Sequence, residues 1–139
     1  KELRYNPKIG QRDGFYLKQI NDIVKFSTGY VVWSQLTSQA KPSALQDLNI
    51  VRLVLYCKKS IESFARFFIF EMNDEITWSK FGGEVVSFLE QIKRKRGLYS
   101  YSVETSATDY ERKTKTFHSN IILEPTRTVE QIQLNFFIK

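Results

Sequence analysis

The sequence predicts an α+β domain in which two consecutive helices pack on an antiparallel sheet, with extended N- and C-terminal arms. The first observation is a stretch from Lys41 to Gly97 whose apolar residues recur every three or four positions, as on helix faces. The second is that Asn73-Asp74 divides this stretch into two helices. The third is that strand-like runs lie before and after it. This order is typical of a sheet with helices on one side.

Length and charge limit the classes of function that we consider. The 139 residues suit one domain, and 42% of them are hydrophobic, which is enough to bury a core. No window is long and apolar enough to span a membrane, and no secretory signal pattern opens the sequence. The net charge of +6 favours an acidic partner: nucleic acid, an anionic membrane or a negatively charged protein surface. Because the chain opens with Lys1 instead of Met, we expect a piece of a longer polypeptide or a removed start.

The N-terminal part is predicted to contain an arm and then two strands. Residues 1–14 are polar and rich in turn residues, so we interpret them as an N-terminal arm or connector, with the domain itself in residues 15–139. The following run is β-branched and aromatic, as in Tyr30-Val31-Val32-Trp33. It predicts two short strands around a turn at Ser27-Thr28-Gly29.

The first helix is predicted to open at Pro42-Ser43. Ser43 and Gln46 have the spacing of a capping box, in which two side chains bind free backbone N–H groups of the first turn. The apolar residues that follow form two stripes, so we expect the helix to be packed on more than one side. The run ends at Met72, and its aromatic cluster from Phe67 to Phe70 is predicted to be core rather than a ligand pocket.

The second helix is predicted to be capped by Asp74 or Thr77. Gly82-Gly83 lies inside it, and because each interior Gly costs about 1 kcal/mol against Ala, we expect a neighbouring backbone to approach closely there. The predicted buried face is a stripe of large apolar residues at helical spacing: Trp78, Phe81, Val85, Phe88 and Ile92.

The last turn of this helix is strongly basic. Lys93 to Arg96 lie where cations offset the helix dipole, and Gly97 is predicted to be the left-handed cap. Two interpretations of the basic turn stay open. It is either a solvated helix end or a contact with an acidic surface.

After the helices, the pattern predicts three strands in an antiparallel meander. Residues 99–104 alternate between apolar and polar, residues 105–116 read as a loop, and Phe117 to Leu123 form the second strand. Val129 to Ile138 form the third. This last strand either closes the domain's own sheet or pairs with the sheet edge of another molecule.

The sequence predicts no catalytic residues, no metal ligands and no cofactor, so we do not expect an enzyme. Cys57 and His118 are the only residues of their kinds, and Cys57 is expected to be a buried structural thiol rather than a nucleophile. The acidic cluster of Glu71, Asp74 and Glu75 is interpreted as a capping environment before an acid–base pair. No phosphate-binding glycine loop and no nucleic-acid-binding motif is present.

Five segments, in this order and spacing, resemble the C-terminal domain of bacteriophage contractile tail sheath proteins, most of all the T-even type. The match is good over residues 33–101 and weak over residues 102–116. Val51-Arg52 stands where the family has a double Arg. The segments are Lys41-Pro42-Ser43-Ala44-Leu45, Leu48-Asn49-Ile50-Val51-Arg52-Leu53, Phe70-Glu71-Met72-Asn73-Asp74-Glu75-Ile76-Thr77, Phe88-Leu89 and Arg96-Gly97-Leu98-Tyr99.

The resemblance implies a structural subunit of a contractile sheath. Residues 15–139 would form the sheath's inner domain, with 128–139 as a terminal strand exchanged with a neighbour. Copies would polymerise around the tail tube, and contraction would drive tube ejection. The implied partners are further copies of itself, the tail tube protein, and baseplate and tail terminator proteins, with no membrane and no cofactor. The implied location is the tail of the virion, assembled in the host cytoplasm.

The resemblance also implies two groups of contact residues. A partly electrostatic contact with the tube would involve the basic helix end, whose candidates are Lys93, Arg94, Lys95 and Arg96. A strand shared between subunits would involve the C-terminal run, whose candidates are Gln131, Ile132, Gln133, Leu134, Asn135, Phe136, Phe137 and Ile138.

Two alternatives are kept beside this interpretation. The first is a sheath or sheath-terminator component of a related contractile injection system, of the pyocin or type VI secretion kind. The second and less favoured is a nucleic-acid-binding module, motivated by the net charge of +6. Binding to nucleic acid that weakens steeply with salt would support the second alternative.

Overall fold

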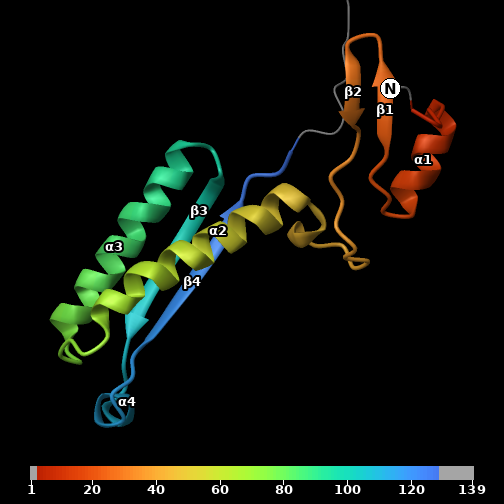
Figure 1. The fold of residues 1–139 in the computed structure, drawn as a ribbon. Coiled ribbons are helices and arrows are strands. Elements are labelled where there is room, and N and C mark those ends of the chain that lie inside the picture. The colour runs from red at the N-terminus through yellow and green to blue at the C-terminus, as the bar shows by residue number, and fades with distance from the viewer. Residues whose placement is uncertain (1–2, 129–139) are drawn as a thin grey trace, which may run out of the picture. The chain divides into compact units, whose positions relative to one another are not determined.

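The computed structural model describes residues 3–128. The chain divides into two compact units, Lys1–Lys59 and Ser60–Lys139, and each is described by itself. Figure 1 shows their elements, and the predicted α+β class is confirmed. Among the described residues, no helix is both long and apolar enough to cross a lipid bilayer.

The first unit begins with a helix that the sequence analysis did not predict. Helix α1 spans Ile9–Leu17, so the backbone is not extended throughout residues 1–14. One half of a capping box starts the helix: the Lys8 backbone N–H donates to the Gln11 side-chain oxygen at 3.0 Å, while the Lys8 side chain has no acceptor to complete it. The helix lacks buried residues, which is why no apolar periodicity indicated it. That residues 1–14 act as an arm stays a prediction.

The two short strands predicted next are confirmed. Strands β1 (Ile23–Phe26) and β2 (Gly29–Val32) form an antiparallel hairpin in which Phe26 pairs with Gly29. Val24 is buried. No third strand joins this sheet in the part of the chain that the structure describes.

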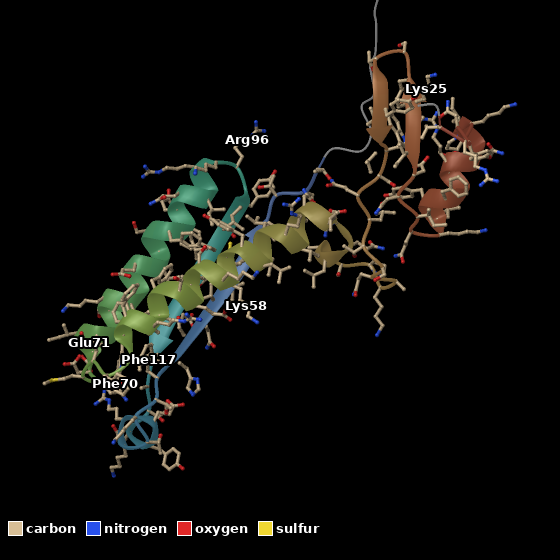
Figure 2. The ribbon with its side chains drawn as sticks, viewed as in Figure 1. Lys25, Lys58, Phe70, Glu71, Arg96 and Phe117 are labelled. Atoms are coloured by element: carbon tan, nitrogen blue, oxygen red, sulfur yellow. The ribbon has the colours of Figure 1, made fainter. Side chains whose placement is uncertain are left out.

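A side chain occupies part of the outer edge of β1. The Asn6 amide oxygen accepts the Lys25 backbone N–H at 2.9 Å, and its nitrogen donates to the Lys25 carbonyl at 3.3 Å. Asn6 thus satisfies both backbone groups of a strand residue, as a neighbouring strand does. Figure 2 labels Lys25 on this hairpin.

The predicted first helix is broken at both ends. A 3₁₀ turn, η1 (Ala44–Gln46), precedes helix α2 (Leu48–Ala65), and a second 3₁₀ turn, η2 (Arg66–Phe68), follows it. Ser43 does act as a cap, because its hydroxyl oxygen accepts the Leu45 backbone N–H at 3.2 Å, but it caps η1. Cys57 is buried in α2, as predicted, and burial raises the pKa of its thiol.

The second unit is built on helix α3 (Glu75–Arg94). Asp74 caps it by accepting the Thr77 backbone N–H at 2.9 Å. The predicted buried face is largely confirmed, except that Leu89 is fully buried and Phe88 is half-buried. The predicted close approach of a backbone at Gly82-Gly83 is wrong: the Thr105 side-chain oxygen lies at an ordinary contact distance of 3.4 Å from the position that a Cβ of Gly82 would take, and Gly83 faces open space.

Helix α3 packs against the first strand of an antiparallel hairpin. Strands β3 (Leu98–Ser106) and β4 (His118–Pro125) pair from Ser106–His118 to Leu98–Pro125, which confirms the first two predicted C-terminal strands. The predicted loop between them contains a short helix, α4 (Asp109–Lys113), which a capping box between Thr108 and Glu111 stabilises. The predicted third strand, Val129 to Ile138, lies outside the described residues.

Candidate functional site

The basic end of α3 is closed by a left-handed residue, but not by the predicted one. Arg96 has φ of 65°, whereas Gly97 does not adopt a positive φ. The Arg96 N–H donates to the Lys93 carbonyl at 2.9 Å, and the Gly97 N–H donates to the Ile92 carbonyl at 3.0 Å. This is the double hydrogen bond of a Schellman motif with Arg at the position that usually carries Gly.

The four predicted tube-contact residues divide into two pairs. Arg94 Nε lies 3.7 Å from Glu90 Oε1, and Lys93 Nζ lies 5.8 Å from the centre of the Tyr101 ring. Tyr101 in turn donates its hydroxyl to Glu90 at 2.9 Å, and partial burial together with this bond raises the pKa of Tyr101.

The other two cations, Lys95 and Arg96, make no ion pair within residues 3–128. Figure 2 shows Arg96 at the turn after α3, directed away from the ribbon. All four side chains are exposed, but Lys93 and Arg94 have partners within the domain, whereas Lys95 and Arg96 have no ion pair among the described residues. Lys95 and Arg96 are therefore the cations that can bind an acidic partner without giving up a bond inside the domain.

The β3–β4 hairpin offers an unpaired strand edge. Within the described range β4 pairs only with β3, so the backbone groups along its other edge lack a strand partner. Its residues alternate between exposed and half-buried, and the large side chain of Ile122 is exposed. The predicted exchanged-strand residues Gln131 to Ile138 lie outside the described residues, so their strand role stays a prediction.

A pocket lies where α2 is followed by α3, and the sequence analysis missed it. Its volume is about 610 Å³. The prediction that Phe67 to Phe70 form core is wrong for most of this cluster, since Phe67 is 80% exposed and Phe70 is fully exposed. Figure 2 shows Phe70, Glu71 and Phe117 together at this end of the second unit. We call it the turn pocket; its lining is Ala65, Phe68, Ile69, Phe70, Glu71, Met72, Asn73, Thr77, Lys115, Thr116 and Phe117.

Aromatic rings hold part of the turn pocket in place. The rings of Phe68 and Phe117 both make edge contacts with Phe81 of α3, at centroid distances of 5.4 Å and 5.6 Å. Because Phe81 is buried, these two lining residues are anchored in the core of the second unit.

A hydrogen-bond network holds two further lining residues, Asn73 and Thr116. The Asn73 side chain donates to the Thr116 carbonyl at 3.0 Å and accepts the Trp78 indole N–H at 2.7 Å. Arg112 lies over the Trp78 ring at 4.9 Å and pairs with Glu75 at 3.4 Å. The pocket wall is therefore tied to α3 and to the residues after α4 independently of any partner.

Of the acidic cluster at this junction, Asp74 has the predicted capping role, whereas Glu71 and Glu75 cap no helix in the described residues. Asp74 is the cap of α3, and the Thr77 N–H holds the pKa of the Asp74 carboxyl below its usual value. Glu75 pairs with Arg112, while Glu71 lines the turn pocket. Among residues 3–128, no group of three or more His, Cys, Asp and Glu side chains could hold a metal ion.

Comparison with known proteins supplies the family. The sequence profile of the phage tail sheath C-terminal domain matches residues 40–139. The chain belongs to this family. It is 33% identical over 138 residues to the tail sheath protein of Vibrio phage KVP40, covering 96% of this chain and 21% of that protein. It is 28% identical over 139 residues to the tail sheath protein of Enterobacteria phage T4, covering 97% of this chain and 21% of that protein.

Solved structures with the same fold are contractile machines. A chain of the anti-feeding prophage baseplate has a TM-score of 0.89 at 21% identity, covering 100% of this sheath domain chain and 42% of its own length. A chain of the sheath complex of an extracellular contractile injection system, in the contracted state, also has a TM-score of 0.89 at 21% identity. The match covers 98% of this chain and 42% of that one. The chain spans 21%, or about a fifth, of the length of each of the two tail sheath proteins that it matches. The resemblance inferred from the sequence is confirmed.

Proposed function

We propose that this chain is the inner, assembly-forming domain of a contractile tail sheath subunit, which polymerises around a tail tube by exchanging strands. The observation that supports the proposal is that each sheet consists of a two-stranded hairpin in the described part of the chain. Two-stranded sheets are marginally stable alone, and an open strand edge is a template for a strand from another molecule. The apolar run Val129 to Ile138 is the strand that we expect to be donated.

Strand exchange suits a machine that contracts without coming apart. Each backbone hydrogen bond formed between subunits contributes about 0.5–1.5 kcal/mol net. A strand paired along the eight residues of β4 therefore makes a durable link. The domains can then move as near-rigid bodies during contraction while these links persist, and the movement drives tube ejection. The location that follows is the tail of a virion, with the tube, baseplate and tail terminator proteins as further partners.

Removal of the donated strand tests this function. Deletion of Gln131 to Lys139 is expected to abolish polymers in sedimentation and electron microscopy, because the acceptor edge loses its strand. The circular dichroism spectrum of the protein should change little, since the described elements remain. A matched control keeps the length and replaces only the exposed Tyr110 of α4 by Ser. Normal polymers from the truncated protein would contradict strand exchange.

A second candidate is a sheath component of a related contractile injection system. The fold shared with the anti-feeding prophage and the extracellular injection system favours it. The higher sequence identity is to phage proteins, so we prefer the phage tail. Electron microscopy of purified virions labelled with an antibody against this chain separates the two, because only a phage component lies on a tail below a DNA-filled head.

A further inference from the structure

We propose that the turn pocket holds the apolar end of a donated strand, Phe136 to Ile138, supplied by a second copy of this chain. The inference rests on the proposed strand exchange and deepens it, because it names the place where the end of the donated strand is held. It also explains why large apolar side chains at this end of the second unit face solvent.

The surface around the pocket is apolar to a degree that calls for a covering partner. Phe67, Ile69, Phe70, Met72 and Ile76 are all exposed, and Met72 is 78% exposed. Exposed apolar side chains that cluster in this way mark interaction surfaces, whereas single ones are ordinary. The volume of about 610 Å³ lies in the range of pockets that enclose apolar groups.

Phe70 is held in an unfavourable conformation at the pocket. Its φ is 76°, in the left-handed region that bulky residues avoid, and its side chain is fully exposed. A strained backbone at a ligand or partner site persists when the arrangement serves binding. Here the strained backbone holds a large, fully exposed aromatic ring in the lining of the pocket, where an incoming side chain can pack against it.

The direction of β4 identifies what arrives at the pocket. Phe117 lines the pocket and immediately precedes His118, where β4 begins. A strand added antiparallel to the free edge of β4 therefore runs towards Phe117, and its last residues reach the pocket. The run Val129 to Ile138 ends with Phe136-Phe137-Ile138, three large apolar residues in a row.

The length of the donated run fits this arrangement. Strand β4 has eight residues. Val129 to Ile138 is longer than that by two residues, so a run that starts opposite Pro125 extends past His118. The pocket then receives Phe137 and Ile138, which extend beyond β4, with Phe136 opposite His118 at the edge of the pocket.

Charge orients the end of the run in the pocket, and chain direction favours delivery from another copy. The lining carries one charge of each sign, Glu71 and Lys115, and the basic Lys139 follows the apolar end of the run, so we expect it on the Glu71 side. The Thr126 N–H still donates to the Gly97 carbonyl at 3.2 Å, so the chain leaves β4 at the end opposite to the pocket. To reach the pocket, the protein's own C-terminal segment would have to turn back along β4. The segment of a neighbouring copy does not have to make this turn.

Cross-linking between two singly substituted proteins tests the placement directly. In a Cys57→Ala background of the full-length protein, one copy carries Met72→Cys and the other carries Phe137→Cys. After co-assembly, a short bismaleimide is expected to join the two copies, and neither protein should form this product alone. Replacing Met72→Cys by Val86→Cys, an exposed site on α3 outside the pocket, is the matched control and should abolish the product.

Each other outcome of the cross-linking overturns a stated part of the inference. Polymers that form normally without any 72–137 product show that the strand end lies elsewhere, and strand exchange itself remains. A product within a single chain that carries both substitutions, but none between copies, assigns the pocket to the protein's own C-terminal segment. Either result contradicts the proposal as stated.

The substitution Phe70→Gly supplies a second test in which stability and assembly change in opposite directions. Glycine suits the left-handed backbone, so the thermal midpoint of the unassembled protein should rise. Loss of the ring should raise the critical concentration for polymerisation about tenfold, because burial of a large apolar side chain is lost. Gln19→Gly is the control, since Gln19 also has a left-handed backbone, with φ of 57°, and does not line the pocket. Equal critical concentrations for the two variants would exclude a role of Phe70 in assembly.

Discussion

At the residue scale, the four non-glycine residues with positive φ between residues 3 and 128 explain much of what the sequence did not reveal. Gln19, Arg96 and Lys115 follow the ends of α1, α3 and α4, and Phe70 follows η2. Rules for helix ends search for glycine, so they selected Gly97 instead of Arg96. The predicted position of the helix end was right to within one residue. The prediction of which residue has the left-handed backbone was wrong.

Arg96 offers a direct measurement of this strain. Arg96→Gly is expected to raise the free energy of unfolding by about 1 kcal/mol, because a side chain in the left-handed region is disfavoured and glycine is not. Chemical denaturation of the unassembled protein measures it. Gly97→Ala is the matched comparison, since Gly97 has no positive φ and should show no corresponding gain. A decrease in stability on Arg96→Gly would show that the arginine side chain has a structural role.

At the element scale, periodicity predicted the elements that bury a face and missed those that do not. The strands β1 to β4 and most of α3 were found from apolar spacing. Helices α1 and α4 have no buried residues, so no periodic pattern marks them. The spacing of Thr108 and Glu111 in a capping box was a signal that could have revealed α4. The turn pocket could not be predicted, because aromatic residues in a row are usual in cores.

The capping box of α4 makes this element sensitive to acid. The Thr108 backbone N–H, with His118 Nε2 2.8 Å away, lowers the pKa of Glu111 from its ordinary 4.5. Because the folded-state pKa is the lower one, the stabilisation is present above pH 4.5 and is lost as pH falls through the folded-state value.

Amide hydrogen exchange in α4 measures this effect. Protection should fall as the pH is lowered below the ordinary Glu pKa of 4.5, after correction for the intrinsic exchange rate. Glu111→Gln should reduce protection already at neutral pH and remove most of its pH dependence. Asp109→Asn is the control, since Asp109 does not form the capping box. Equal pH profiles for the wild type and Glu111→Gln would contradict the assignment.

At the scale of the whole molecule, membership of the sheath family gives three separate surfaces a common interpretation as contacts within one assembly. The open edge of β4, the turn pocket and the outward cations after α3 all belong to the second unit. We propose that the first two join subunits and that Lys95 and Arg96 contact the tube. The sequence alone predicted the family and the basic turn, but it treated the four cations alike. The i,i+4 spacing of Glu90 and Arg94 was a signal that could have separated Arg94, whereas the contact of Lys93 with Tyr101 of β3 depends on the fold.

The tube contact yields a prediction with an internal comparison. Lys95→Glu together with Arg96→Glu should greatly reduce co-sedimentation with purified tubes at low salt, because an electrostatic attraction becomes a repulsion. Lys80→Glu, an exposed charge reversal elsewhere on α3, is the control. Co-sedimentation that is unchanged in the double variant would exclude these residues from the tube contact.

The Asn6 side chain that binds both backbone groups of Lys25 has a consequence for how far a sheet can grow. A hairpin with two open edges accepts strands on both sides, and such growth has no natural limit, as in amyloid. A guest strand along β1 would have to displace Asn6 from Lys25, whereas a strand along β2 would displace no such bond within the described residues. Addition to the first hairpin is therefore biased towards β2, and Asn6 acts as a built-in competitor on the other side.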